Sequence, residues 1–324
     1  MKFRPFKLTL VLAILISTSF SATSLAAGNS NSKSPNENAI GYWNQDRLDG
    51  ALSRDFEFEP GAKSGKLVAQ GKSTRGGGGS TTSITGSSWT KGGLPLLATG
   101  KVFFTMGNVN YVCSGALANE TVSARSIVLT AGHCVWDDTS AAFATNFIFI
   151  PAYDSNPVNN CSTSLGRCLS ASALVASSGF TSQTTFTTQA TNYDWGFAVV
   201  NETPQPGFDL AVNALSTNSI INAFGYPQGQ PYNGTKLIYC SGPITADAKN
   251  LGLTWGLGCN MTDGASGGPW LSSFDSKTFT GKLASVNSYK YRNDSKRMYG
   301  PNFNSATQAT FDAAKLANGN TIVN

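Results

Sequence analysis

One serine and one histidine stand in sequence settings that suit nucleophilic catalysis. Ser266 lies in the stretch 264–269, which reads Gly-Ala-Ser-Gly-Gly-Pro. Glycine permits positive φ and proline prevents a helix from running straight out of the serine, so the stretch predicts a tight loop. A serine hydroxyl becomes a good nucleophile only beside a positioned base. The chain contains a single histidine, His133, which is therefore the candidate base.

A serine–histidine pair needs a third group that fixes the imidazole tautomer and stabilises its charged form. Asp194 suits this role because it precedes the apolar run 195–200, where a carboxylate is shielded from water and held rigidly. Asp137 and Asp138 lie too close to His133 along the chain to turn back onto its ring. An ordinary turn residue at the start of a strand is the alternative interpretation of Asp194.

The order of these residues along the chain excludes two other serine hydrolase classes. The stretch 264–268 also fits Gly-x-Ser-x-Gly, the nucleophile elbow of α/β-hydrolases. That fold places its histidine after the serine, and no histidine follows Ser266. The subtilisin order requires an acid before His133, where the nearest carboxylate, Glu120, lies in a polar turn without a supporting motif.

The elements that must position these groups are short strands. Gly (34 residues) and the low charged fraction of 13% are typical of a β-rich chain with polar loops. Apolar segments at modest spacing predict an all-β barrel or sandwich. The final segment, 305–317, predicts a helix with Phe311, Ala314 and Leu316 near one face. The predicted strands span 102–105, 110–117, 126–130, 143–150, 174–176, 195–200, 220–224, 235–240 and 282–288.

Six cysteines in an exported chain indicate disulfides, and their spacing groups them into three local pairs. This pairing is a hypothesis among the many connectivities that six cysteines allow. One bridge would fix the segment that carries the base, and another would brace the loop that carries the nucleophile. With one histidine and no Cys-x-x-Cys, we expect no metal site. The pairs are Cys113–Cys134, Cys161–Cys168 and Cys240–Cys259.

The net charge of +5 does not indicate a nucleic-acid partner. From Lys91 onward the chain has 13 Lys and Arg against 12 Asp and Glu, so the positive excess lies in the leader. The first residues include Lys2, Arg4 and Lys7, followed by the apolar run 8–16 and small residues near 24–26. This pattern predicts a secretory signal peptide over 1–26, with an uncleaved anchor as the alternative.

Residues 27–90 are predicted to form a leader that ends in a flexible linker. Its one organised piece is a short helix with Asn44 as the cap and Leu48 and Leu52 on one face. The run 75–80 reads Arg-Gly-Gly-Gly-Gly-Ser and is typical of an exposed, cleavable linker. We expect the leader to be removed between Lys63 and Lys91.

Three motifs in this order resemble a known family. The stretches Thr-Ala-Gly-His-Cys at 130–134, Asp-Trp-Gly-Phe-Ala at 194–198 and the loop at 264–269 resemble the signatures of chymotrypsin-like (trypsin-like) serine endopeptidases. The similarity extends from about Leu96 to the C-terminus. It implies two six-stranded antiparallel β-barrels with the active site between them and a C-terminal helix. Residues 91–324 would then form the peptidase domain.

The resemblance also implies residue roles. His133 would be the general base, Asp194 would orient it, and Ser266 would attack the peptide carbonyl to give an acyl-enzyme. The N–H groups of Gly264 and Ser266 would form the oxyanion hole, and no cofactor is expected. A catalytically silent homologue that acts as a binding protein, or an esterase using the same site, is the alternative.

Further details of the sequence bear on the branch and on specificity. The stretches 149–153, 225–227 and 259–262 look like the secreted microbial branch related to glutamyl endopeptidases. Asn260, six residues before the serine, would form an uncharged floor of the substrate pocket, and Asn287 would stand in its wall. Neither position gives a charge that would dictate strict basic or strict glutamyl specificity.

Two departures from the family pattern concern activation and the pocket entrance. Ala265 replaces the aspartate that precedes the serine in many trypsin-like enzymes, which puts their activation mechanism in doubt. Lys290 and Arg292 are interpreted as members of a solvated loop, with a preference for acidic substrate side chains as the alternative. We expect a secreted monomer that acts on protein or peptide substrates, without nucleic-acid or stable membrane partners.

Overall fold

The computed structural model describes most of the chain after the first residues. The chain divides into two units, Met1–Ser32 and Lys33–Asn324, and every described residue except Met1 belongs to the second. The predicted signal peptide, apart from Met1, lies outside the described residues. No helix in the described ranges has the length and apolar character that spanning a bilayer requires. The described residues are Met1, 35–68, 83–123, 125–153, 161, 168–200, 205–251 and 253–324.

Six strands of the first sheet close into a barrel. The sheet contains β1 (Leu52–Ser53), β5 (Thr99–Met106), β6 (Val109–Ala118), β7 (Ser126–Thr130), β10 (Thr145–Pro151), β11 (Leu169–Ser177), β12 (Gly196–Val200) and β21 (Thr321–Val323). β5 pairs with β6 and β10, β11 pairs with β10 and β12, and β7 pairs with both β12 and β6. All these pairs are antiparallel, and together they close the ring of six strands.

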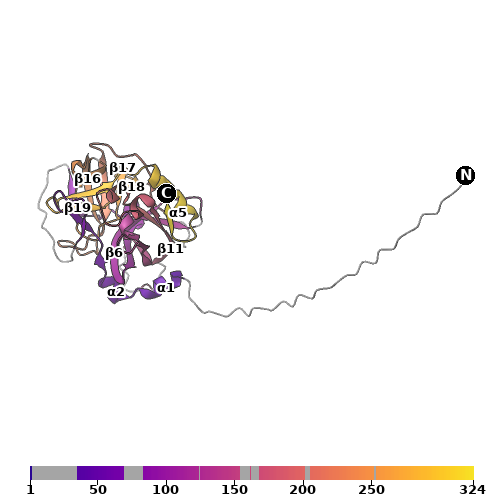
Figure 1. Ribbon diagram of the computed structural model, residues 1–324. Helices are drawn as coiled ribbons and strands as arrows, with labels where there is room; N and C mark the ends of the chain where they lie inside the picture. The colour runs from indigo at the N-terminus through magenta and orange to yellow at the C-terminus, as the bar shows by residue number, and fades with distance from the viewer. Residues whose placement is uncertain are drawn as a thin grey trace. The chain divides into compact units, whose positions relative to one another are not determined.

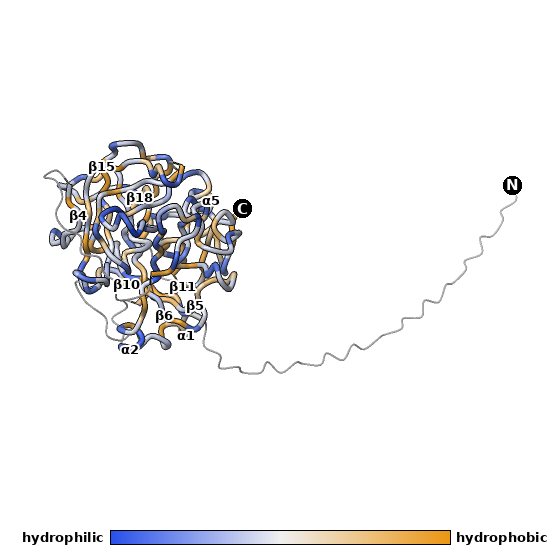
Figure 2. The backbone as a smooth tube through the Cα atoms, turned by 60° about the vertical axis from the view of Figure 1, so that its left-hand side comes forward, coloured by the Kyte–Doolittle hydropathy of each residue, from blue (hydrophilic) through white to orange (hydrophobic). Residues whose placement is uncertain are grey.

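A two-residue turn joins β5 to β6, between the predicted strands 102–105 and 110–117. Gly107 and Asn108 both have positive φ, 53° and 65°, as a tight hairpin turn with the right-handed twist of its strands requires. β5 is buried along its whole length, with Val102 and Phe103 fully inaccessible to solvent. Figure 2 shows long hydrophobic stretches along β10 and β11, which pack into the same core.

The second sheet runs along a longer path. It contains β2 (Phe56–Phe58), β3 (Lys66–Leu67), β4 (Ile84–Ser88), β13 (Asp209–Leu210), β14 (Ile220–Gly225), β15 (Ile238–Ala246), β16 (Thr254–Gly258), β17 (Pro269–Asp275), β18 (Thr280–Val286), β19 (Tyr289–Tyr291) and β20 (Arg297–Pro301). Its order is β13-β18-β17-β14-β15-β16-β20-β19-β2-β3, with β4 on β15, and it has a core of its own. A further short pair joins β8 (Trp136–Asp137) to β9 (Ala142–Phe143). The predicted all-β architecture is confirmed.

Few helices accompany the sheets. They are α1 (Pro35–Tyr42), α2 (Gln45–Asp49), α3 (Gly93–Ala98), α4 (Ser178–Thr181), α5 (Ser305–Leu316) and the 3₁₀ turns η1 (Gly132–Cys134), η3 (Ala190–Tyr193) and η4 (Ala248–Asn250). The predicted C-terminal helix is confirmed as α5, which packs on β11 and β12 through Phe311 and Ala314. The predicted burial of Leu316 is wrong, because five residues of helix turn it away from Phe311 and leave it 72% exposed.

The leader is more organised than the sequence predicts. Asn44 caps α2 as expected, accepting a hydrogen bond from the N–H of Arg47. Leu48 is buried, but Leu52 has left the helix for β1 and is exposed. Figure 1 shows α1 and α2 beside β6 of the first barrel. From there the leader supplies one strand to the first sheet, β1, and three strands to the second, β2, β3 and β4.

Candidate active site

His133 lies in η1, directly after β7, and is 1% exposed. The disulfide Cys113–Cys134 ties this turn to β6, with an S–S distance of 2.07 Å. Among the described residues, the one group of potential metal ligands consists of these two cysteines and His133. Both sulfur atoms are bonded to each other, so they are not free to act as thiolate ligands.

Asp194 holds the imidazole through a buried set of hydrogen bonds. It follows η3 at the entrance to β12 and is 0% exposed. Its Oδ2 lies 2.8 Å from Nδ1 of His133, and its Oδ1 accepts the N–H of His133 at 2.9 Å. The hydroxyl of Ser288 donates to Oδ2 at 2.5 Å. A proton on Nδ1 satisfies this carboxylate and leaves Nε2 as the acceptor.

The loop around Ser266 takes the tight conformation that its glycines predict. Gly264 and Gly267 have φ of +95° and +79°. A Cβ on Gly267 would lie only 2.1 Å from Oγ1 of Thr130, so this position tolerates glycine alone. Ser114 of β6 braces the loop from below, because its N–H donates to the carbonyl of Ser266 and its hydroxyl donates to the carbonyl of Gly264, at 2.7 and 2.9 Å.

The two asparagines predicted for the substrate pocket are both engaged elsewhere. Asn287 is 0% exposed, donates to the carbonyl of Ala265 at 3.0 Å and accepts the indole N–H of Trp270 at 2.8 Å. It therefore braces the nucleophile loop, and the structure does not place its side chain in a pocket wall. Asn260 accepts the hydroxyl of Tyr232 at 2.6 Å and is partly exposed.

Ser266 and His133 are brought together without a hydrogen bond between them. The hydroxyl of Ser266 donates instead to Oδ1 of Asp55, at 2.7 Å. Nε2 of His133 is buried and has no hydrogen-bond partner among the described residues. The expected chain of hydrogen bonds therefore links Asp194 to His133 but does not continue from His133 to Ser266.

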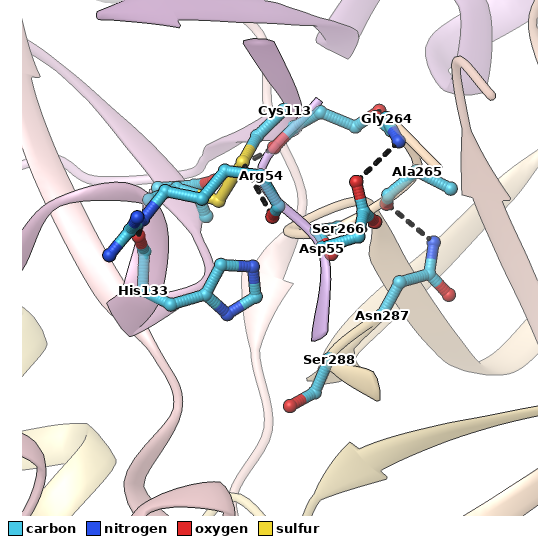
Figure 3. The surroundings of a disulfide bond; sticks show 12 residues. Arg54, Asp55, Cys113, His133, Gly264, Ala265, Ser266, Asn287 and Ser288 are labelled. Atoms are coloured by element: carbon cyan, nitrogen blue, oxygen red, sulfur yellow. Dashed lines mark hydrogen bonds between the residues drawn. A yellow bond between two sulfur atoms is a disulfide. The ribbon is translucent and has the colours of Figure 1, made fainter. Parts of the chain in front are cut away.

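Asp55, a leader residue, occupies the position in front of the nucleophile. Its Oδ2 accepts the N–H of Gly264 at 2.7 Å, as the dashed line in Figure 3 marks. Complete burial raises the pKa of Asp55 above its ordinary value. Hydrogen bonds from Gly264 and from the hydroxyl and N–H of Ser266 oppose this increase in pKa. The two N–H groups predicted as the oxyanion hole thus both act on one carboxylate.

Arg54 binds Asp137 and Asp138, the two acids that lie too close to His133 along the chain to be expected as partners of its ring. Its guanidinium lies 3.1 Å from Asp138 and 3.4 Å from Asp137, and its Nε donates to the carbonyl of His133 at 2.7 Å. Both acids therefore face the leader. Arg54 itself is 4% exposed.

The side chains of Lys290 and Arg292 differ in exposure. Lys290 is only partly exposed, and its ammonium donates to the carbonyls of Cys259 and Ser295 at 3.3 and 2.6 Å. Burial lowers the pKa of Lys290 to about 8, against the opposing effect of Asp263. The prediction of a solvated loop is wrong for Lys290. Arg292, with a side chain 56% exposed, fits that prediction.

Sequence reasoning missed three residues that shape the site: Asp55, Ser114 and Ser288. Each contacts the site from a segment distant in sequence from the group that it binds. Ser288 is the last residue of the predicted strand 282–288 and stands among ordinary polar residues. No local pattern distinguishes Asp55 from the other acids of the leader.

The three disulfides pair as the spacing predicted. Cys161–Cys168 and Cys240–Cys259 join Cys113–Cys134, and no free cysteine is present among the described residues. Cys240 lies in β15, and Cys259 lies a few residues before the nucleophile loop. The Cys240–Cys259 disulfide therefore anchors the segment that leads into the Ser266 loop.

No family model and no curated protein matches this chain. Among solved structures, it is similar to the protease Anisep from Arthrobacter nicotinovorans, with 35% identity and a TM-score of 0.60 over 72% of this chain and 100% of that chain. It is also similar to AL20, a thermostable serine protease from an extremophilic microorganism, with 32% identity and a TM-score of 0.59 over 68% and 98%.

A Glu endopeptidase solved in complex with MPD shares the fold at 18% identity, with a TM-score of 0.53 over 72% of this chain and 98% of that chain. At this identity the likeness extends to the fold alone. The identities to the first two proteases are higher, and this chain spans nearly their whole length. The chain therefore belongs to the family of chymotrypsin-like serine proteases.

Proposed function

We propose that this protein is a secreted serine endopeptidase that hydrolyses peptide bonds through His133, Asp194 and Ser266. The observation that carries the proposal is the buried bond between Asp194 and Nδ1 of His133. This bond leaves Nε2 as the acceptor on the side of the nucleophile. A buried carboxylate in this position fixes the tautomer and stabilises the imidazolium that forms in the reaction.

The proposed reaction has two halves. Ser266 Oγ attacks the peptide carbonyl while Nε2 of His133 takes its proton, and the N–H groups of Gly264 and Ser266 stabilise the oxyanion. The imidazolium then donates its proton to the leaving amine, which leaves an acyl-enzyme. Water, deprotonated by the same nitrogen, attacks the ester, and the acid product departs with Ser266 restored.

The oxygen atoms of Asp55 support this assignment of donors. The N–H of Gly264 already donates to an oxygen atom, Oδ2 of Asp55, at 2.7 Å. A peptide carbonyl oxygen placed there would meet this donor. Removal of one oxyanion-hole donor typically lowers the rate by about 10²–10³.

The substitution Ser266→Ala tests the function. We expect hydrolysis of a casein-type substrate by the processed enzyme to fall about 10⁶-fold, because the nucleophile is lost. Ser276→Ala, which changes an exposed turn serine, is the matched control and should keep full activity. Thermal unfolding of both variants should match that of the unaltered protein. Undiminished turnover by Ser266→Ala would overturn the assignment.

We further propose that the enzyme is exported as a precursor and that its leader is removed. Three disulfides fit an oxidising compartment. Residues 84–88 form β4 of the second sheet and Trp89 is 4% exposed, which favours cleavage before residue 83 within the predicted interval. N-terminal sequencing of the secreted protein locates the cut, and an active mature chain that begins near Gly28 would contradict leader removal.

A further inference from the structure

The leader crosses the site by adding strands to both sheets. β1 pairs in parallel with β6 of the first barrel, and β2 pairs in parallel with β19 of the second sheet. The carbonyl of Phe58 accepts the N–H of Arg292 at 2.9 Å, which continues the pairing. Strand addition of this kind is a common way for a protein to bind an extended peptide. We call residues 52–58 the latch.

Asp55 stands at the centre of the latch and blocks the reacting groups. Its carboxylate accepts hydrogen bonds from the hydroxyl of Ser266 and from the N–H of Gly264. A carboxylate has no leaving group and is a poor electrophile, so Ser266 cannot form an acyl-enzyme with it. The backbone carbonyl of Asp55 accepts the N–H of Val68 at 2.9 Å and is therefore held away from the oxyanion donors.

The latch also encloses the histidine. The ring of Phe56 lies edge-on to the imidazole of His133 at 5.4 Å and stacks on Phe186 at 4.2 Å. Arg54 holds the backbone of the same histidine through its carbonyl. Nε2 therefore faces neither solvent nor a hydrogen-bond partner among the described residues.

The cavity that the described residues form beside Ser266 is too small for a substrate side chain. The cavity lined by Asp55, Phe56 and Glu57 of the latch, with Ser266 and Lys290 opposite, has a volume of about 10 Å³. This is space for about one water molecule. Substrate binding therefore requires that the latch leave the site.

We propose that the latch keeps the precursor inactive by holding the Ser266 hydroxyl and the Gly264 N–H on the Asp55 carboxylate, so that release of the leader is the activating step. The inference rests on the proposed peptidase function and adds the group that inhibits it. The leader acts as a built-in ligand whose carboxylate competes with the substrate carbonyl for the same donors.

The test compares labelling of Ser266 by a fluorophosphonate in the intact precursor and in the cleaved enzyme. For this test, a recognition site for an unrelated protease is introduced within residues 75–80 of the full chain. Measurement of the intact mass confirms that the precursor is uncut before labelling. Unaltered precursor should label at least about 100-fold more slowly than cleaved enzyme freed of its leader. Asp55→Ala precursor should label about 10- to 100-fold faster than unaltered precursor, because a hydrogen bond to a charged group contributes about that factor.

Glu59→Ala is the matched control in the same segment. Glu59 pairs with the exposed Arg292 and does not touch Ser266, so its precursor should label as slowly as the unaltered one. An unaltered precursor that labels as fast as the cleaved enzyme overturns the latch alone. A cleaved enzyme that never labels overturns the proposed function and the latch together.

A second measurement avoids any effect of substitution on folding. A synthetic peptide of residues 35–68 is added to unaltered cleaved enzyme, and inhibition of peptide hydrolysis is measured. The peptide should inhibit, and the same peptide with Asp55→Ala should require about 10- to 100-fold more for equal inhibition. Equal potency of the two peptides would contradict a blocking role for this carboxylate.

Discussion

At the scale of single residues, the acids around Ser266 influence one another. Burial, together with the neighbouring carboxylates of Asp55 and Glu57, raises the pKa of Asp263 to about 7, against the opposing effect of Lys290. Both neighbouring acids come from the leader. The ionisation of Asp263, three residues before the nucleophile, is therefore coupled to the presence of the latch.

This pKa predicts how precursor stability changes with pH. An unfolded Asp loses its proton near pH 4, whereas folded Asp263 keeps it to about pH 7. The folded state binds more protons between these values, so the free energy of unfolding falls as pH rises from about 4 to 7. Above pH 7 this contribution is constant.

Urea unfolding of Ser266→Ala precursor between pH 4 and 8 measures the effect without autolysis. When Asp263→Asn is added to this variant, the free energy of unfolding should fall less steeply between pH 4 and 7, because the amide does not titrate. Asp275→Asn is the control: its carboxyl is fully exposed, and hydrogen bonds lower its pKa. If Asp263→Asn leaves the slope between pH 4 and 7 unchanged, the raised pKa is not a property of the folded precursor.

At the scale of elements, the disulfide between Cys240 and Cys259 fixes β15 against the segment before the nucleophile loop. Replacing both cysteines by serine should lower the free energy of unfolding by about 2–4 kcal/mol, because the unfolded chain regains the freedom of its loop. The measurement is denaturant unfolding under non-reducing conditions.

Cys161 and Cys168 supply the matched comparison. Their separation is 7 residues against 19 for Cys240 and Cys259. Loop-closure entropy makes the smaller ring stabilise by about 0.9 kcal/mol less, so the corresponding double serine variant should lose less stability. A larger loss from the smaller ring would show that native contacts of the bridges, rather than loop closure, dominate.

At the scale of the whole molecule, the leader is bound both at Ser266 and at a second place, distant from Ser266, on the first barrel. Trp43 is 1% exposed, packs on Phe103 of β5 and donates its indole N–H to the carbonyl of Asn146 at 2.6 Å. This residue joins the leader to the core of the first barrel. Covalent cleavage alone therefore leaves a buried anchor in place, and the leader must also dissociate.

Trp43→Ala should weaken leader binding without changing the enzyme that remains after processing. Loss of a buried Trp typically destabilises by about 3–5 kcal/mol, so the cleaved leader should dissociate more readily and the precursor should unfold at lower temperature. Leu67→Ala, at a leader leucine that is 42% exposed, should change little. Size-exclusion chromatography of nicked protein measures leader retention, and equal retention by the Trp43→Ala and unaltered chains would contradict the anchor.

Much of the site was predictable because its chemistry is local. A single histidine left no choice of base, and the glycines around Ser266 dictate a loop that only positive φ allows. Short apolar runs predicted the strands, and close spacing paired the cysteines. The pattern failed at Leu316, where helix geometry turned an apolar residue outward, and it did not reveal that the side chain of Asn287 hydrogen-bonds the loop that carries Ser266.

The sequence by itself predicted which groups would do the chemistry, in what order they occur and which cysteines pair, because those inferences depend on residue type and local spacing. Only the tertiary structure decided that Asp55 meets Ser266, 211 residues away. Nothing in a leader aspartate foretells that contact. It depends on the folding of the first barrel and the second sheet, on the pairing of β1 with β6 and of β2 with β19, and on burial that excludes water from the Asp55 carboxylate.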